Sequence, residues 1–238
     1  MGYSLSEIQK ICEKSYKNIL KIRKKILFKM ALNFLLHKET RVEGIINGKV
    51  VEDFINKAAK LKNINLIKDL KTRSLAIATV DTISMKECIF TSQKIEPQDK
   101  KIDYISNISI GAAVRSSMAF PAIFTTSNFD NYNFIDGGTV DNLPTKVLKE
   151  IGAQKIIAIC FDLTNYSPSK SLEGVLIRAL DIFSNSAVEK AKKLADVSIE
   201  IYNPDTSLIT MKDIKKTMDN GYHSVMKNKD KILALLQD

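Results

Sequence analysis

A carboxylate followed by two glycines, Asp136-Gly137-Gly138, stands at the end of a short apolar segment, residues 133–135. A carboxylate at a strand end, followed by a glycine turn, is a common way to present an acid or a base at the rim of a sheet. We expect both glycines to have positive φ and to keep side chains out of the space in front of the carboxylate. Asp136 is therefore the candidate general base, and a turn-capping aspartate is the alternative.

Histidine- and lysine-assisted nucleophiles are other arrangements that the sequence could hold. His37 and His223 lie in lysine-rich stretches with no acidic partner in register, so we expect no catalytic triad with either histidine. Ser167 and Ser224 each have a lysine at the spacing of a Ser–Lys pair. Because the chain holds 36 lysines and arginines, such spacings arise by chance, and we assign both serines to a loop or a surface helix.

No motif predicts a cofactor or a metal. The sequence has no phosphate-binding Gly-Lys-Ser loop and no cluster of metal-ligating residues. Its cysteines, Cys12, Cys88 and Cys160, are widely spaced and form no Cys-x-x-Cys pair. That spacing argues against a disulfide framework or a zinc site and fits a reduced cytoplasm.

The elements that must position Asp136 follow from the hydrophobic pattern. Residues 75–80 form a continuous apolar run, which predicts a strand buried on both faces and ended by Asp81. Residues 88–91 predict its partner strand. Residues 108–118 predict a helix that ends before Pro121, because the residue preceding a proline avoids the helical region.

Strands and helices alternate along the rest of the chain. Pro144 fits the first turn of a helix that ends at Gly152, and Asp141 is expected to help start that helix. The remaining expected elements are a helix at 51–61, a strongly buried strand at 155–161, a helix at 172–195, a strand at 197–201 and a helical region at 211–236. This alternation predicts one α/β domain over residues 1–238.

The chain is basic, with a formal net charge of +9. That charge favours anionic surroundings such as lipid headgroups, and an evenly lysine-rich surface is the alternative. The basic residues are spread out rather than clustered with aromatic residues, so we expect no nucleic-acid binding. The most apolar stretch, residues 26–36, is too short to span a bilayer, and no signal-peptide pattern precedes it. These features predict a soluble cytoplasmic protein.

Residues 4–34 have the pattern of an amphipathic helix. Ser4 and Glu7 have the spacing of a capping box, and apolar residues recur at helical spacing as far as Phe34, opposite a face of lysines. We expect this helix to pack on the core through its apolar face. A helix that lies on a membrane surface is the alternative.

Several segments in a fixed order carry a family resemblance. They are Gly2-Tyr3-Ser4-x-x-Glu7-Ile8, Ala78-Thr79-x-Asp81 with Phe90, Arg115-Ser116-Ser117 with Pro121-x-x-Phe124, Asp136-Gly137-Gly138, and Ala195-Asp196-Val197-x-Ile199 with Gly221-Tyr222. A lone Asp-Gly-Gly is common in ordinary turns. The ordered set resembles the patatin-like phospholipases, which are serine acyl hydrolases with a Ser–Asp dyad.

The resemblance implies a three-layer α/β/α sandwich with a mixed, largely parallel central sheet. It also implies a nucleophilic serine on a sharp strand-to-helix turn, activated by an aspartate without a histidine, and a glycine-rich loop whose N–H groups stabilise the oxyanion. Asp136 takes the position of that aspartate, and Gly137, Gly138 and Arg115 are motif residues. Lipid or phospholipid acyl esters would be the substrates, with peripheral contact to an anionic membrane surface. Arg115 could then meet a lipid phosphate or form a structural ion pair.

The nucleophile motif of the family does not occur in the sequence. Gly-x-Ser-x-Gly is absent, and Gly44 and Gly48, which have that glycine spacing, flank Ile46. We therefore expect a truncated family member without its glycine-rich loop, its nucleophile turn and its first strands. The alternative is a non-catalytic remnant that acts as a lipid-surface or protein-docking module. Loss of central strands would expose apolar faces and strand edges on runs such as 75–80 and 156–161.

Overall fold

The structure, a computed structural model, describes residues 1–13, 44–95, 101–162, 172–202 and 214–237. The chain divides into two compact units, Met1–Gly138 and Thr139–Asp238, here named the N-terminal unit and the C-terminal unit. Residues 5–13 are helical, and Ser4 and Glu7 form the predicted capping box. The rest of the predicted N-terminal helix lies outside the described residues.

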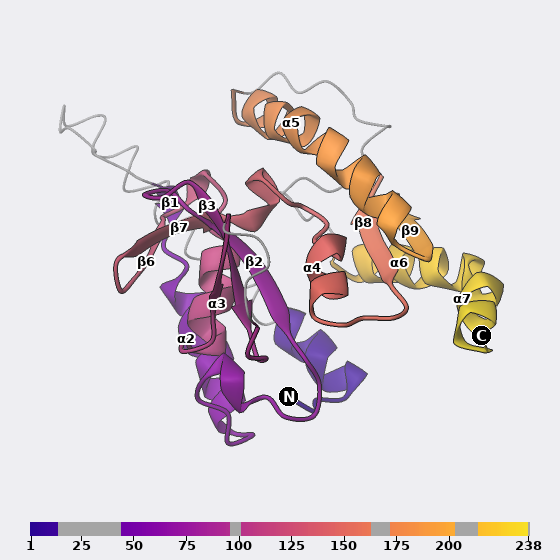
Figure 1. The fold of residues 1–238 in the computed structure, drawn as a ribbon, viewed down its shortest axis with the longest axis horizontal. Coiled ribbons are helices and arrows are strands. Elements are labelled where there is room, and N and C mark those ends of the chain that lie inside the picture. Colours follow the sequence, from indigo (N-terminus) through magenta and orange to yellow (C-terminus); the bar gives the residue numbers. More distant parts are fainter. Residues whose placement is uncertain (14–43, 96–100, 163–171, 203–213, 238) are drawn as a thin grey trace. The chain divides into compact units, whose positions relative to one another are not determined.

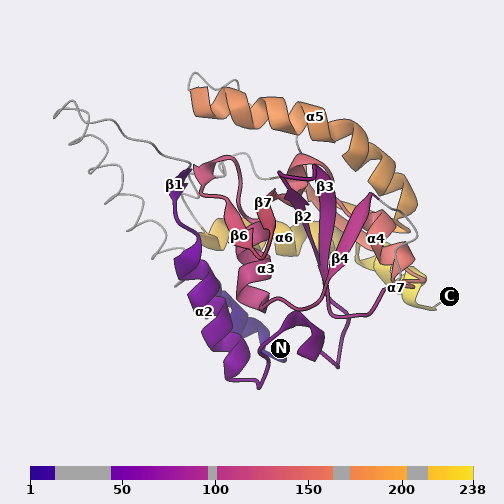
Figure 2. The same cartoon turned by 60° about the vertical axis from the view of Figure 1, so that its left-hand side comes forward.

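The N-terminal unit is built around a five-stranded sheet. Its elements are β1 (Gly44–Ile46), α2 (Lys49–Lys60), η1 (Ile67–Asp69), β2 (Ala76–Asp81), β3 (Lys86–Thr91), β4 (Ile102–Ile105), α3 (Ile110–Ser117), β5 (Ala122–Phe124), β6 (Ser127–Phe129), β7 (Tyr132–Asp136) and η2 (Gly137–Thr139). The sheet has the strand order β4-β3-β2-β7-β6, whose strands are all labelled in Figure 2. β2 is antiparallel to both of its neighbours, β3 and β4 are parallel, and β1 pairs with β5 in a separate parallel sheet.

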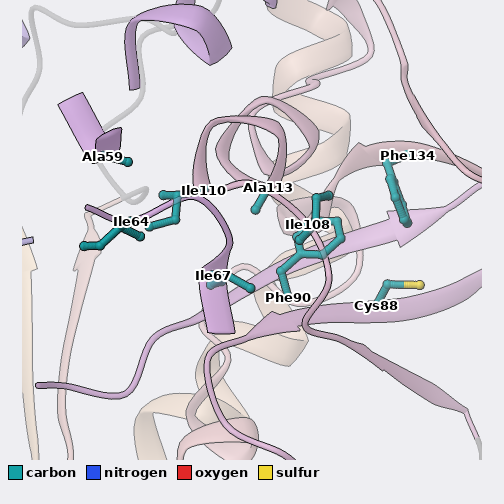
Figure 3. Close-up of a cluster of buried hydrophobic side chains, with 9 residues drawn as sticks. All are labelled: Ala59, Ile64, Ile67, Cys88, Phe90, Ile108, Ile110, Ala113 and Phe134. Atoms are coloured by element: carbon teal, nitrogen blue, oxygen red, sulfur yellow. The ribbon is translucent and has the colours of Figure 1, made fainter. Parts of the chain in front are cut away.

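The core of this unit lies between the sheet and the helices α2 and α3. Figure 3 shows Ile110 and Ala113 of α3 beside the strands that carry Phe90 and Phe134. The rings of Phe90 and Phe134 meet edge to face with their centroids 5.1 Å apart, a favourable aromatic geometry. Both phenylalanines are fully buried, so β2 and its neighbouring strands rest on a well-packed apolar layer.

Helices α2 and α3 lie side by side (Figures 1 and 2). Gly111 permits this approach, because a Cβ atom at this position would lie 2.3 Å from the backbone oxygen of Glu52. The Gly111 N–H donates to Oδ1 of Asn56 at 2.9 Å, and Ser109 caps α3 by accepting from the N–H of Ala112. The first turn of α3 is therefore fixed by side chains from α2 and from its own N-cap.

The C-terminal unit is built around two parallel strands. Its elements are α4 (Thr145–Glu150), β8 (Ile157–Phe161), α5 (Leu172–Leu194), β9 (Val197–Ile201), α6 (Ile214–Lys227) and α7 (Lys229–Gln237). Val188 and Ala191 of α5, the long orange helix of Figure 2, pack on Ala158 of β8. The Asp196 carboxylate accepts the N–H of Ile156 at 2.7 Å and joins the start of β8 to the start of β9.

The α/β class with mixed strand pairing is confirmed, and helices flank the sheet of the N-terminal unit as predicted. Within the five-stranded sheet most pairings are antiparallel, whereas the two smaller sheets are parallel. The strands and helices predicted between residues 51 and 201 each match an element, and the described part of the expected helical region at 211–236 forms α6 and α7 with a break at Asn228. The prediction of a single domain stays a prediction.

Four short strands, β1, β4, β5 and β6, were not predicted from the sequence. Each holds only three or four residues, too few to show an alternating pattern. The prediction of a strongly buried strand at 155–161 is wrong for one face, because Ile157, Ile159 and Phe161 are exposed.

Candidate functional site

Asp136 is the last residue of β7, and the 3₁₀ turn η2 follows it directly. Its backbone N–H donates to the carbonyl of Ala119, in the segment after α3, at 3.1 Å. Its Oδ1 accepts the N–H of Gly138 at 2.7 Å. This last bond is the turn-capping contact of the alternative interpretation, and it also fixes the orientation of the carboxylate.

The two glycines after Asp136 do not have positive φ, so the prediction of left-handed conformations is wrong. Among the described glycines, φ is positive at Gly2 and Gly152. Gly137 is required for a different reason, because a Cβ atom on it would lie 2.5 Å from the carbonyl oxygen of Ala78. The turn after Asp136 therefore presses against the backbone of β2, and only a residue without a side chain fits there.

The surroundings of Asp136 favour its protonated form. Burial raises the pKa of the Asp136 carboxyl above its ordinary value, and the hydrogen bond from the Gly138 N–H opposes this effect only in part. A carboxylate with a raised pKa takes up a proton more readily, which is the property that a general base at neutral pH needs.

Thr79 and Asp81 lie on β2, the strand that pairs with β7. Thr79 is paired in register with Asp136, and its hydroxyl donates to the carbonyl of Ile135 at 2.7 Å. Oδ1 of Asp81 accepts the N–H of Asn133 at 2.9 Å. The sequence contained a signal for these contacts, the Thr79-x-Asp81 spacing, but gave no indication of their partners.

Arg115 is held in an ion pair inside the N-terminal unit. Its Nη1 lies 3.3 Å from Oε2 of Glu52, and only 17% of the Arg115 side chain is exposed. Its Nη2 donates to the carbonyl of Thr126 at 3.4 Å. Of the two interpretations of Arg115, a lipid-phosphate contact and a structural ion pair, this geometry supports the ion pair, which joins α3 to α2.

Ser116, the first of the two serines that follow Arg115, is not an exposed nucleophile. Ser116 is fully buried, and its hydroxyl bonds to the carbonyl of Ala112 and to the hydroxyl of Ser127, each at 2.9 Å. Ser116 therefore fastens α3 to β6. A hydroxyl held in this way has no path to a substrate.

The remaining sequence candidates lie elsewhere. Asp141 accepts the N–H of Leu143 and so stabilises the turn before α4, without capping α4 itself. Burial raises the pKa of the Asp141 carboxyl, opposed by the Leu143 N–H. His223 and Ser224 lie on α6. His37 and Ser167 lie outside the described residues.

A pocket of about 390 Å³ opens between α2 and the start of α3. It is lined by Asp53, Asn56, Lys57, Lys60, Ile64, Asn65 and Ser109. Asp136 is not among these residues, so this pocket is separate from the candidate base. In the part of the chain that the structure describes, no three metal-ligating side chains gather, and no helix is long and apolar enough to cross a bilayer.

A comparison with protein families agrees with the motifs around Asp136. The family model of the patatin-like phospholipases matches residues 1–149. The match covers the whole five-stranded sheet, the Arg115 helix and the Asp136-Gly137-Gly138 turn.

Proposed function

The chain belongs to the patatin-like phospholipase family, and we propose that it contributes Asp136 as the general base of a lipid acyl hydrolase. The family acts on lipids. The finer assignment rests on one observation: Asp136 carries a partly buried carboxylate at a strand end, oriented by the Gly138 N–H, with its pKa raised by burial.

In the proposed reaction, Asp136 accepts the proton of a serine hydroxyl while the serine oxygen attacks the carbonyl carbon of an acyl ester. The tetrahedral intermediate collapses, the C–O bond to the alcohol breaks, and the alcohol leaves with the proton that Asp136 holds. Water then attacks the acyl-enzyme with Asp136 again as the base, which releases the fatty acid and restores the serine. Backbone N–H groups stabilise both oxyanions.

The serine of this mechanism is not provided by a Gly-x-Ser-x-Gly turn of residues 1–238, because that motif does not occur among them. We propose that a glycine-rich loop and a serine turn, encoded next to this sequence, complete the site. The 238 residues by themselves then hold Asp136 but not the nucleophilic serine of the proposed dyad, and they are expected to hydrolyse no ester. Cytoplasmic location and contact with a membrane surface are part of the same proposal.

The test compares the 238-residue chain with a protein extended by the segment that the neighbouring DNA encodes. Hydrolysis of short-chain nitrophenyl esters and phospholipids, together with fluorophosphonate labelling, should be absent from the short chain and present in the extended protein. Asp136→Asn should lower turnover of the extended protein about 10⁴-fold, because an amide cannot accept the serine proton. Asp141→Asn is the matched control and should leave turnover unchanged.

Two results would overturn the proposal. One is an extended protein in which Asp136→Asn and Asp141→Asn have equal, small effects on turnover. The other is specific fluorophosphonate labelling of the short chain at Ser167 or Ser224, which would identify a different nucleophile.

The second candidate function is a non-catalytic docking module for lipid surfaces. The exposed apolar side chains of β8, together with the net charge of +9, favour it. Co-sedimentation with vesicles separates the two functions: a docking module binds anionic vesicles more tightly than zwitterionic ones, loses binding in high salt, and keeps binding in Asp136→Asn.

A further inference from the structure

The strand that carries Asp136 is held to β2 over a short distance. Only three residue pairs join the two strands: Thr79 with Asp136, Val80 with Ile135, and Asp81 with Phe134. So short a ladder offers few backbone hydrogen bonds, and Asp136 stands at its very end. Side-chain hydrogen bonds between β2 and β7 therefore add to the few backbone bonds that fix the position of the carboxylate.

Thr79 makes one of these bonds directly beside the carboxylate. Its side chain is fully buried, and its hydroxyl donates to the carbonyl of Ile135, the residue before Asp136, at 2.7 Å. Residues directly opposite each other in an antiparallel pair point to the same face of the sheet. The side chains of Thr79 and Asp136 consequently share a face, and the Thr79 hydroxyl anchors the backbone from which the carboxylate extends.

Asp81 fixes β7 three residues before the candidate base. Its Oδ1 accepts the N–H of Asn133 at 2.9 Å, while its Oδ2 accepts the N–H of Ser84 at 2.8 Å and the Ser84 hydroxyl at 2.6 Å. Thr82 completes the contact, since its N–H donates to the Asn133 carbonyl at 2.8 Å. The carboxylate of Asp81 thus links the β2–β3 turn to the start of β7 through hydrogen bonds.

The spacing of the two residues explains why both act on the same strand. Side chains two positions apart in a strand point to the same face, so Thr79 and Asp81 stand one after the other along β7. Asp81 is 2% exposed and Thr79 is fully buried, so neither can meet a lipid or a partner in this conformation. Their polar groups are committed to β7 and to the adjoining turn.

We propose that Thr79 and Asp81 are positioning residues for Asp136, which hold β7 in place so that the carboxylate keeps its orientation at the strand end. Neither residue touches the reacting atoms. The inference rests on the proposed function only in treating Asp136 as the base, because the contacts that hold its strand are independent of activity.

The experiment follows the Asp136 carboxyl by carbon-13 NMR titration in the 238-residue chain. Thr79→Val keeps the shape of the side chain but removes the hydroxyl, so β7 loosens and water reaches the carboxylate. Because burial is what raises the pKa of Asp136, we expect its titration midpoint to fall toward the ordinary aspartate value. Thr79→Ser retains the hydroxyl and should restore the wild-type midpoint, and Asp81→Asn should lower it.

Thr91→Val is the matched control. Thr91 is equally buried, but it lies on β3, and its hydroxyl accepts the N–H of Gln93 rather than reaching β7. This variant also loses a buried hydroxyl, so it reproduces a purely structural effect, and the Asp136 midpoint should not move. An unchanged midpoint in Thr79→Val, or the same fall in Thr91→Val, would overturn the inference.

Hydrogen exchange measured by mass spectrometry gives a second readout at low protein concentration. Amides of residues 132–138 should exchange about three- to tenfold faster in Thr79→Val than in Thr91→Val, the range expected for one lost hydrogen bond. Equal exchange in the two variants would contradict the inference. Neither readout needs turnover, so a failure of the proposed hydrolase function would leave both results standing.

Discussion

Strands β2 and β8 have similar sequences and different surroundings. Each is a run of apolar residues; β2 was predicted to be buried on both faces and β8 to be strongly buried. β2 has a neighbour on each side and is packed over the phenylalanine core, so its second half, from Thr79 to Asp81, is buried. β8 pairs with β9 alone among the described strands, and Ile159 and Phe161 are 51% and 58% exposed.

The parallel register explains which residues of β8 are exposed. It places Ile157, Ile159 and Phe161 on the same face as Val197, Ile199 and Ile201 of β9, since residues paired in register share a face. Helices α6 and α7 contact β9, and Val197 and Ile199 are buried. Those helices cover β9 but leave the adjoining side chains of β8 open. An apolar run therefore shows that a strand forms, whereas its burial depends on what the rest of the chain lays over it.

A matched pair of phenylalanines gives the largest expected difference between the two regions. Phe90→Ala removes a fully buried ring next to β2 and should lower the free energy of unfolding by about 3–5 kcal/mol. Phe161→Ala removes an exposed ring from β8 and should lower it by less than about 1 kcal/mol. Urea unfolding of both variants measures the contrast. Equal losses would mean that the β8 face is covered in solution.

Two glycine substitutions should change the free energy of unfolding in opposite directions. Gly137→Ala forces a methyl group against the carbonyl of Ala78, 2.5 Å away, and should destabilise the chain by about 1–3 kcal/mol. Gly221→Ala lies within α6, where its methyl group would meet Ile201 of β9 at 3.8 Å, an ordinary contact. Because alanine favours helix, we expect a gain of about 0.5–1 kcal/mol. Thermal unfolding of both variants reports the signs.

The pH dependence of stability should differ between the Asp81 carboxylate on β2 and the Asp136 carboxylate at the end of β7. Burial opposes ionisation of Asp81, but hydrogen bonds from Ser84 and Asn133 outweigh it and lower its pKa, so its contribution is present above the ordinary aspartate pKa and is lost as the pH falls. The pKa of Asp136 is raised by burial, so protonation of Asp136 adds stability as the pH falls through its raised value. Asp81→Asn should therefore flatten acid destabilisation, and Asp136→Asn should raise stability at pH 7. A loss of stability in Asp136→Asn at pH 7 would contradict this assignment.

The smallest effect on stability is expected on the exposed face of β8. Ile159→Thr keeps a β-branched residue in the strand and removes part of its exposed apolar surface, so the free energy of unfolding should change by less than about 0.5 kcal/mol. Self-association, followed by light scattering as the concentration rises, should decrease, because exposed apolar strands promote aggregation. Val80→Thr in β2 is the control: it should lower stability and leave self-association of the folded chain unchanged.

Much of the fold followed from local patterns. The runs that became β2, β3, β7 and β9, the end of α3 before Pro121, and the end of α4 before Gly152 all depend on residues close together in the sequence. The three-residue strands could not be predicted, because a strand shows itself in sequence only when it is long enough to alternate. The exposure of β8 could not be predicted either, since it depends on the distant helices that cover β9.

The features of the candidate site likewise fall into those that the sequence determined and those that only the tertiary structure decided. The sequence by itself determined the family, through motifs in a fixed order, and the place of Asp136 at a strand end before two glycines. Only the tertiary structure decided that Gly137 is needed because of the Ala78 carbonyl, that Arg115 pairs with Glu52 across 63 positions, and that the Thr79 hydroxyl reaches Ile135. A sequence specifies the chemical groups and their local conformation, but a hydrogen bond or a close approach between distant segments exists only after packing has brought those segments together.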